Sequence, residues 1–421
     1  MSLRVVTGGA GTGKTTRLLA LANEWLDRIP LRDGQQVLAL TFMHGSKRRL
    51  AERLGRSKAR GRFECVTFDG FARELCNRWR SRVAASGTVI PEDDSPLVHD
   101  AICAGAAMLL AAPDVAKWVA ATHPLIVVDE FQDCGGARPK IVEQLGAVAD
   151  VLVAADPFQD LSALEPNPAL ELLGQMADQT ETLSHVHRTD VPALLAAATA
   201  LRTGKPVVAG PGLTLKTVPG APLGAWEVSL AIAECGSDSP VVIAAGKKFA
   251  TPVIKRVEAK PIGKKGQLGP YRIPWEGTPE TLRSELQEVL AIDDGARSSD
   301  AIRGVLPAGN PLSRWIMEWL ARERRLRGRT EFTPGEIRTQ LARAEAAHRA
   351  TPRRDGGRRA LTVHQAKNRE FRNVIVLWGF DVPPRQEIQR RWLYNAITRA
   401  THSVRIIVLG PDGRLKQPPF A

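Results

Sequence analysis

Short runs of apolar residues alternate with helix-length segments throughout the N-terminal half of the chain. The runs cover residues 3–6, 37–41, 126–129 and 151–155, and most of their positions are Val, Leu, Ile or Ala. A continuous apolar run of this length is typical of a strand that is covered on both faces, as in a parallel sheet. The pattern therefore predicts strands and helices in alternation, which is an α/β domain.

The C-terminal half shows the same rhythm. Apolar runs at residues 241–245, 374–378 and 404–409 predict buried strands, and helical patterns cover residues 281–292 and 389–398. Between them, Thr333 and Glu336 have the spacing of a capping box, which predicts a helix that continues to about Arg349. A second α/β domain follows from this pattern.

Length and charge agree with two folded domains. The chain has 421 residues, 58 Lys and Arg against 45 Asp and Glu, and a net charge of +13. Residues 322–359 hold 12 Arg against five acidic residues, so much of the excess is local. Such a patch attracts polyanions, although a basic run is often only a solvated surface. The five cysteines contain no CxxC pair, which argues against a disulfide framework or a zinc site.

No targeting or membrane segment is expected. A strand-like run begins at Leu3, and the longest apolar run, residues 101–112, is shorter than the roughly 20 residues that span a bilayer. We expect a cytoplasmic protein that does not enter a membrane.

Residues 8–15, GGAGTGKT, satisfy the P-loop pattern GxxxxGK[ST] directly between a predicted strand and a predicted helix. Backbone N–H groups of such a loop surround phosphates, Lys14 reaches the outer phosphates, and the Thr15 hydroxyl is a ligand for Mg²⁺. The predicted nucleotide-binding residues are Gly8, Gly9, Ala10, Gly11, Thr12, Gly13, Lys14, Thr15 and Thr16. The predicted substrate is ATP with Mg²⁺.

The strand at 126–129 ends in two carboxylates. Asp129 is placed to hold Mg²⁺ with Thr15, and Glu130 to orient and deprotonate the attacking water. A helix N-cap at Asp129 is the simpler alternative.

The acidic pair belongs to the segment 129–133, which reads DEFQD. With this segment the chain resembles the UvrD/Rep family of superfamily 1 helicases. Further matches follow in the family's order: 40–44 (LTFMH) with LTFTN, 66–71 (VTFDGF) with TFHSF, 155–159 (ADPFQ) with GDxxQ, 187–189 (HRT) with Tyr-Arg-Ser, 362–371 (TVHQAKNREF) with TLHxSKGLEF, and 394–400 (YNAITRA) with YVALTRA. The resemblance extends from Gly8 to Ala400.

The resemblance implies roles for these positions. Lys14, Glu130, Gln159, Arg188 and Arg399 would be catalytic, with Gln159 sensing the γ-phosphate and the two arginines offsetting charge on the transferred phosphoryl group. Glu370 would contact the ribose. Single-stranded DNA would contact Thr41, Phe42, His44, Thr67, Phe68, His364 and Lys367; Phe42 and Phe68 could equally be core residues.

Several positions depart from the family. Asp69 and Gly70 replace the usual His-Ser, Asn368 and Arg369 replace Gly-Leu, and the tyrosine and tryptophan that follow the glutamine in SIYRWRGA are missing after Gln159. With no upstream glutamine motif, Arg17 and His187 are the candidates for adenine stacking.

We therefore expect two RecA-like P-loop NTPase domains with parallel sheets, at residues 1–185 and 186–421. A reduced helical insertion is expected at about 79–120 and a small Arg-rich one at about 308–359. The predicted function is 3′ to 5′ movement on single-stranded DNA, with or without a 3′-tailed duplex, by a protein that is monomeric without DNA.

Two alternatives stay open. One is a DNA-stimulated ATPase or translocase that does not unwind duplex. The other is an ATP-switched subunit that recruits a nuclease or another partner in repair or anti-phage defence.

Overall fold

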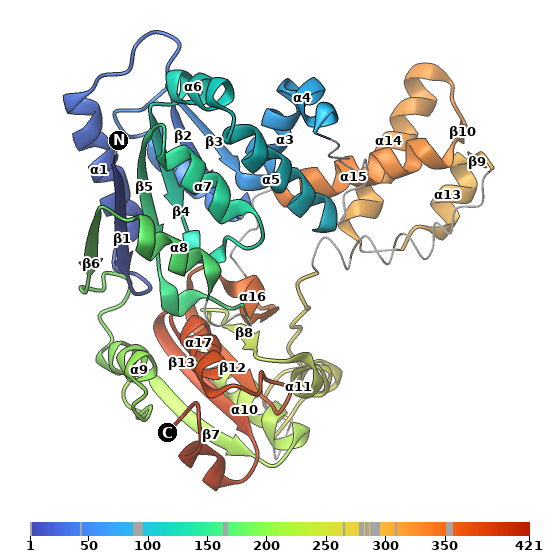
Figure 1. Cartoon of the computed structure of the whole chain (residues 1–421). Coiled ribbons are helices and arrows are strands. Elements are labelled where there is room, and N and C mark those ends of the chain that lie inside the picture. Colours follow the sequence, from blue (N-terminus) through green and yellow to red (C-terminus); the bar gives the residue numbers. More distant parts are fainter. Residues whose placement is uncertain are drawn as a thin grey trace. The chain divides into compact units, whose positions relative to one another are not determined.

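The computed structural model describes residues 2–42, 44–86, 96–162, 167–263, 266–277, 295–307, 310–350 and 357–421, together with Leu282 and Leu286 (Figure 1). It divides into two compact units. The larger unit joins Met1–Pro274 to Gly356–Ala421, and the smaller one is Trp275–Asp355.

The first sheet of the larger unit is wholly parallel. Its strands lie in the order β3-β2-β4-β5-β1-β6, with these bounds: β1 Leu3–Gly8, β2 Val37–Thr41, β3 Phe63–Thr67, β4 Leu125–Asp129, β5 Asp150–Ala155 and β6 Gln179–Leu183. Parallel strands share one edge for their carboxyl ends, so Gly8 and Asp129 lie at the same edge.

Both faces of this sheet are covered. Along β2, Leu38 and Leu40 point into one core while Val37 and Ala39 point into the other, because side chains alternate along a strand. One face packs on helices α1 (Lys14–Arg28) and α2 (His44–Leu54). The other packs on α3 (Phe68–Arg78), α5 (Pro96–Leu110), α6 (Pro113–Thr122), α7 (Arg138–Gly146) and α8 (Pro168–Met176), with α4 (Arg80–Ala85) beside α3 and α5.

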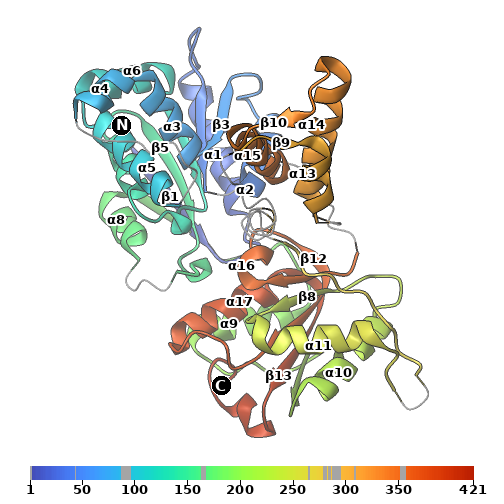
Figure 2. The same cartoon turned by 90° about the vertical axis from the view of Figure 1, so that its right-hand side faces the viewer.

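The second sheet is also parallel, in the order β11-β8-β12-β13-β7. Its strands are β7 Leu213–Val218, β8 Val241–Ala244, β11 Ala360–Thr362, β12 Phe371–Trp378 and β13 Ala400–Leu409. One face packs on α9 (Pro192–Thr203), α16 (Val363–Ala366) and α17 (Gln386–Ile397). The helices α10 (Ala221–Glu234) and α11 (Lys247–Ala259) cover the other face (Figure 2). Two parallel sheets, each between layers of helices, confirm the predicted α/β class of two RecA-like domains.

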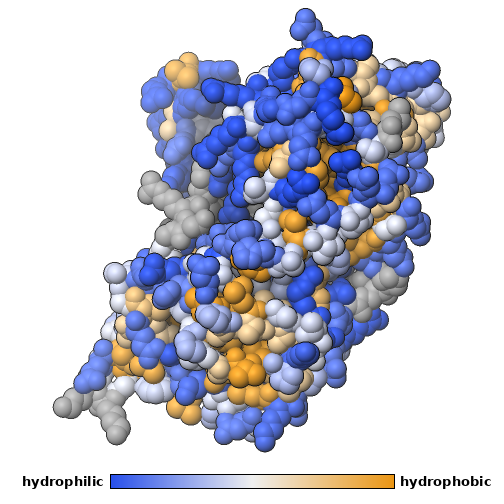
Figure 3. All heavy atoms as spheres, turned by 90° about the vertical axis from the view of Figure 1, so that its left-hand side faces the viewer, coloured by the Kyte–Doolittle hydropathy of each residue, from blue (hydrophilic) through white to orange (hydrophobic). Residues whose placement is uncertain are grey.

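The side of the molecule that carries β6 and α9 is shown in Figure 3. Hydrophilic side chains cover much of this face, and hydrophobic atoms gather in a patch in the lower half of the view.

All seven predicted strands are confirmed, as β1, β2, β4, β5, β8, β12 and β13. The prediction missed β3, β6, β7 and β11. Each of these four lies at an edge of its sheet, where one side of the strand meets solvent and polar residues such as those of β6 (QTETL) are tolerated. The predicted helix at 389–398 corresponds to α17, whereas most of 281–292 lies outside the described residues.

Among the described residues, no single helix has the length and hydropathy of a membrane span. One pair of consecutive helices, His99–Leu110 and Pro113–Thr122, has the combined length and hydropathy of a membrane span, but the pair is bent by 95° where the two helices meet. Both helices contribute buried residues to the first core, for example Ile102 and Val119. They lie within the predicted 79–120 insertion.

The smaller unit is a helical module with its own core. A two-stranded ribbon, β9 (Arg297–Ser298) and β10 (Glu331–Phe332), accompanies α13 (Ser299–Val305), α14 (Pro311–Arg327) and α15 (Pro334–Ala350). Thr333 and Glu336 form the predicted capping box, with Glu336 N donating to Thr333 Oγ1 at 3.3 Å and Thr333 N to Glu336 Oε2 at 3.0 Å. Leu282 and Leu286 share the core with Ile316, so the unit begins earlier than the predicted 308.

Candidate functional site

The P-loop joins β1 to α1, as its sequence predicts. Gly11 and Gly13 adopt positive φ angles of 76° and 83°, which glycine tolerates without strain. A Cβ at Gly11 would lie 2.5 Å from Arg188 Cβ, so the loop is closely approached by the segment that follows β6. Lys14 Nζ donates to the carbonyl oxygens of Gly8 at 3.0 Å and Gly9 at 2.9 Å, which holds the amine inside the loop.

Thr15 and Asp129 lie together at the carboxyl edge of the sheet. Thr15 Oγ1 donates to Asp129 Oδ2 at 3.0 Å. Burial, reinforced by the charge of Glu130, raises the pKa of Asp129 to about 7. A buried carboxylate beside a hydroxyl is the oxygen donor set that Mg²⁺ prefers, so the residues present fit this metal.

Glu130 directly follows β4 in the left-handed conformation, with φ 59° and ψ 44°. Its carboxylate accepts from Gln132 Nε2 at 2.5 Å, and Gln132 Oε1 accepts from Asp156 N at 3.0 Å. Gln159 Nε2 donates to Asp156 Oδ2 at 2.9 Å. One hydrogen-bonded chain thus connects the predicted base, Glu130, to the predicted γ-phosphate sensor, Gln159.

The two predicted arginines come from different segments and meet near Glu130. Arg399 is buried and donates to Asn395 O and to Thr398 Oγ1, each at 3.0 Å. Burial and the nearby charge of Arg188 together lower the pKa of Arg399 to about 10, although the charge of Glu130 opposes both. Arg188 donates to Thr398 O at 3.0 Å and pairs with Glu370 at 2.9 Å, so Glu370 is engaged by an arginine in this structure.

The C-terminal sheet's helices reach the P-loop through two contacts that sequence reasoning missed. Tyr394 OH accepts the Ala10 N–H at 2.7 Å. Arg202, at the end of α9, pairs with the fully buried Asp156 at 2.9 Å and lies over the rings of Phe158 and Tyr394. In the sequence, Arg202 has only the signature of a cation that complements a helix C-terminus.

Lys367, a predicted nucleic-acid contact, has its amine engaged by protein groups in this structure. Its amine forms an ion pair with Asp133 of the DEFQD segment and donates to Gln159 O at 2.8 Å, with only 5% of the side chain exposed. A buried, paired amine is not available to a phosphate. Lys367 instead ties the segment after β11 to the carboxyl edge of the first sheet.

Three further predicted nucleic-acid contacts are buried in this structure. Phe68 has 0% exposure and packs in the core with Leu40 and Ile126, so its ring is a core residue and not a stacking surface. Thr41 is buried, and the Thr67 hydroxyl caps α3 by accepting Gly70 N at 3.1 Å. Strand ends that feed a helix bury their side chains, which the motif letters do not reveal.

The other predicted contacts are placed differently. Phe42 is 39% exposed at the end of β2, and His364 is exposed with its ring 5.1 Å from that of Trp392. His44 begins α2, and its side chain lies outside what the structure describes.

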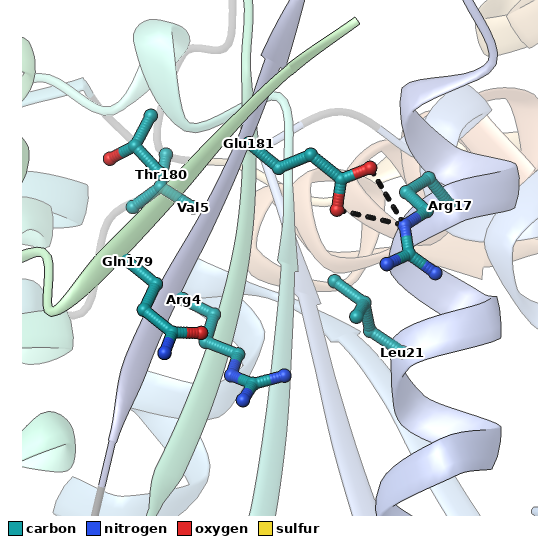
Figure 4. Close-up of a pocket in the computed structure, with 7 residues that line it drawn as sticks. All are labelled: Arg4, Val5, Arg17, Leu21, Gln179, Thr180 and Glu181. Atoms are coloured by element: carbon teal, nitrogen blue, oxygen red, sulfur yellow. Dashed lines mark hydrogen bonds and ion pairs between the residues drawn. The ribbon is translucent and has the colours of Figure 1, made fainter.

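One candidate adenine contact, His187, lies beside the P-loop, and the other, Arg17, lies on the first turn of α1. His187 N donates to Gly11 O at 2.8 Å, and its ring would lie 3.7 Å from a Cβ at Gly13. Arg17 points to Glu181 on β6, with Arg17 Nε 2.9 Å from both carboxylate oxygens (Figure 4). It lines a pocket of about 470 Å³ with Arg4, Leu21 and Gln179. An adenine role for either residue stays a prediction.

Two family profiles match the chain. The profile described as AAA domain covers residues 1–212, and the UvrD-like helicase C-terminal domain covers residues 358–407. The second segment contains Lys367, Glu370, Tyr394 and Arg399. No curated protein matches the chain.

Two solved structures match this chain at low identity. Arterivirus nonstructural protein 10 (helicase) matches with 11% identity and a TM-score of 0.40, over 98% of this chain and 61% of that one. Its complex with DNA matches with 12% identity, the same coverage and the same TM-score. The chain thus spans about three fifths of the length of these viral proteins.

Proposed function

The chain belongs to the AAA domain family and carries a UvrD-like helicase C-terminal domain, and on this premise we propose that it is an ATP-dependent DNA motor. It hydrolyses ATP at the P-loop and uses the cycle to move 3′ to 5′ along single-stranded DNA. The observation that carries the proposal is the position of Arg399, where the charges of both Glu130 and Arg188 act on it, because this adds arginines that are distant in sequence to a P-loop site.

Each residue has one task in hydrolysis. Lys14 leaves the Gly8 and Gly9 carbonyls to contact the outer phosphates, and the P-loop N–H groups hold the remaining oxygens. Thr15 and Asp129 would hold Mg²⁺, which would neutralise phosphate charge. Glu130 takes the proton of the attacking water, and Gln132 keeps its carboxylate in place.

The arginines make hydrolysis depend on the relation between the two sheets. Arg399 is held in place by its hydrogen bonds to Asn395 and Thr398, whereas Arg188 forms an ion pair with Glu370. Cations preorganised at the transferred phosphoryl group are worth about 10³ to 10⁵ in rate. A small displacement of one sheet's helices would therefore switch hydrolysis on or off, which is the property a motor needs.

Three contacts couple the P-loop sheet to the second sheet. Tyr394 contacts Ala10, Arg202 pairs with Asp156, and Lys367 pairs with Asp133. Ala10 belongs to the phosphate loop, Asp156 is part of the chain that connects Glu130 to Gln159, and the Lys367 amine also donates to Gln159 O. Phosphate binding and release would change these contacts first.

A second candidate is a DNA-stimulated ATPase or ATP-switched subunit that does not unwind duplex by itself. Asp160 favours it. Where the family places stacking aromatics after Gln159, the Asp160 carboxylate is buried and accepts from Ser162 N at 2.8 Å and Ser162 Oγ at 2.9 Å. The ATP-bound chain would then recruit a nuclease or another partner in repair or defence, and it would act in the cytoplasm as a monomer until DNA binds.

The test is ATP hydrolysis by wild type and Glu130→Gln without nucleic acid, with single-stranded DNA and with single-stranded RNA. The same samples are then tested for displacement of 3′-tailed and 5′-tailed duplexes. Stimulation by DNA that Glu130→Gln abolishes, with displacement only of the 3′-tailed duplex, supports the motor. Stimulation without displacement favours the second candidate, and no stimulation by either polymer refutes the motor.

A further inference from the structure

We propose that Arg138 is a positioning residue that holds the ring of Phe42 as a stacking surface for an unpaired nucleobase. No motif assigns Arg138, which lies at the start of α7, just after the DEFQD segment. The inference rests on the proposed function, because it concerns how this protein contacts single-stranded nucleic acid.

The Arg138 guanidinium lies over the Phe42 ring, with Cζ 5.4 Å from the ring centroid. This is a cation–π contact between α7 and the end of β2. Phe42 is nevertheless 39% exposed, so part of the ring faces solvent while the cation supports it. The neighbouring aromatic of the predicted DNA contacts, Phe68, is buried and cannot serve in the same way.

Two carboxylates fix the guanidinium. Arg138 Nε and Nη2 donate to Asp69 Oδ1 at 2.9 and 2.6 Å, and Nη1 donates to Asp100 Oδ1 at 2.8 Å and to Gly135 O at 3.1 Å. Hydrogen bonds between charged partners are short and directional, so the side chain has little freedom. The Arg138 side chain is only 8% exposed.

This cluster explains a departure from the family's sequence. Asp69 stands where the TFHSF segment has histidine, and here its carboxylate accepts from Arg138 and lies 3.4 Å from His99 Nδ1. Gly136 permits the arrangement, because a Cβ there would lie 2.7 Å from Asp100 Oδ1. The aspartate is therefore one half of an ion pair that supports the ring and has no need to face the DNA itself.

The same geometry argues against Arg138 as a phosphate contact. Four of its N–H···O interactions are made inside the protein, and the two carboxylates offset its charge. A ring face stacks with any base, so the contact would be tolerant of sequence and would require an unpaired base.

The test measures binding of a single-stranded oligonucleotide that contains 2-aminopurine, whose fluorescence reports stacking. The variants are Phe42→Ala, Arg138→Met and the double variant. Arg78→Met is the matched control, because Arg78 lies 4.3 Å from the Trp118 ring centroid in the same lobe and is not part of the cluster. Binding is measured at several salt concentrations, with circular dichroism as the readout of folding.

We expect Phe42→Ala to weaken binding about 5- to 100-fold, which is the range for one lost base stack. Arg138→Met should weaken binding less and should reduce the quenching of 2-aminopurine fluorescence that stacking causes, while the double variant should bind no more weakly than Phe42→Ala. The salt slope and the Arg78→Met variant should match wild type. If Arg138→Met fails to fold, Asp69→Asn takes its place, because it weakens the same ion pair. It should likewise reduce the quenching of 2-aminopurine fluorescence.

Two results would overturn the inference. The first is an additive loss in the double variant together with a salt slope lower by about 0.7, which would make Arg138 a phosphate contact. The second is wild-type binding and stacking by every Arg138 and Asp69 variant. If wild type itself binds no single-stranded DNA, the proposed function fails instead, so the two failures are distinguishable.

Discussion

Removing the Lys367 amine tests the contact that joins the two sheets most directly. Lys367 and Asp133 are 5% and 11% exposed, and the amine also donates to Gln159 O. The substitution Lys367→Met keeps most of the length and volume of the side chain and deletes only the charge. It leaves Asp133 buried, where burial already raises its pKa above the ordinary value of 3.8.

The magnitude has an upper limit. A buried carboxylate that has lost its cation can avoid the cost of burying a charge by taking up a proton. For a group with a pKa of 3.8 in the unfolded chain, protonation at pH 7 costs about 1.4 kcal/mol per pH unit, or about 4 kcal/mol in all. The loss of one partner of a buried ion pair usually costs about 3 to 5 kcal/mol. We therefore expect Lys367→Met to lower the free energy of unfolding by about 3 to 4 kcal/mol at pH 7.

The sign of the pH dependence follows from the same reasoning. A carboxylate whose pKa is raised in the folded state favours folding more as the pH falls toward its unfolded pKa. The difference between Lys367→Met and wild type should therefore shrink to about 2 kcal/mol at pH 5. In the double variant with Asp133→Asn no carboxylate remains to titrate, so the variant's own free energy of unfolding should lose the pH dependence that Asp133 contributes in wild type.

The assay is urea unfolding at pH 5, 6 and 7, followed by circular dichroism. Lys255→Met, at an exposed position of α11, is the control for the loss of a surface lysine and should change stability by less than about 0.5 kcal/mol. A destabilisation by Lys367→Met below about 1 kcal/mol, or one that does not vary with pH, would refute the buried ion pair. It would also restore Lys367 as a candidate nucleic-acid contact.

Three further outcomes are expected. Arg202→Met should raise the KM for ATP about tenfold, because Asp156, without its arginine partner, would attract Lys14 away from the phosphates; Lys14 Nζ already lies 3.7 Å from Asp156 Oδ2. Arg28→Met is the control, and an unchanged KM in Arg202→Met would contradict the reasoning. Gly246→Ala should lower the melting temperature, because its Cβ would lie 2.1 Å from Asp381 Oδ2, whereas Gly174→Ala, which meets nothing within 4 Å, should not. Burial raises the pKa of Cys76 to about 11 and of Cys103 to about 12, so iodoacetamide at pH 8 should label both thiols more than about 100-fold more slowly in the folded protein than in urea. Mass spectrometry of the two peptides measures the labelling rates, and equal rates in both conditions would show that the thiols are accessible.

Local patterns were sufficient for the central strands and for the phosphate loop. The runs that became β2, β4 and β5 are apolar at nearly every position because both faces of the sheet are covered. The P-loop letters and the acidic pair at Asp129 and Glu130 are contiguous in sequence, and chemistry dictates their residue types. Edge strands such as β6 were not predicted, because exposure allows polar residues that resemble a loop.

Only the tertiary structure decided which side chains face outward and which meet across the two sheets. Phe42 and Phe68 occupy similar places in their motifs, yet one is exposed and the other is in the core, because Phe68 begins a helix that packs on the first sheet. Asp156 and Arg202, or Asp133 and Lys367, are far apart in sequence, and no local spacing connects them. Their pairing depends on how the two sheets pack, which is set by buried surface summed over the whole chain and not by the residues of any one motif.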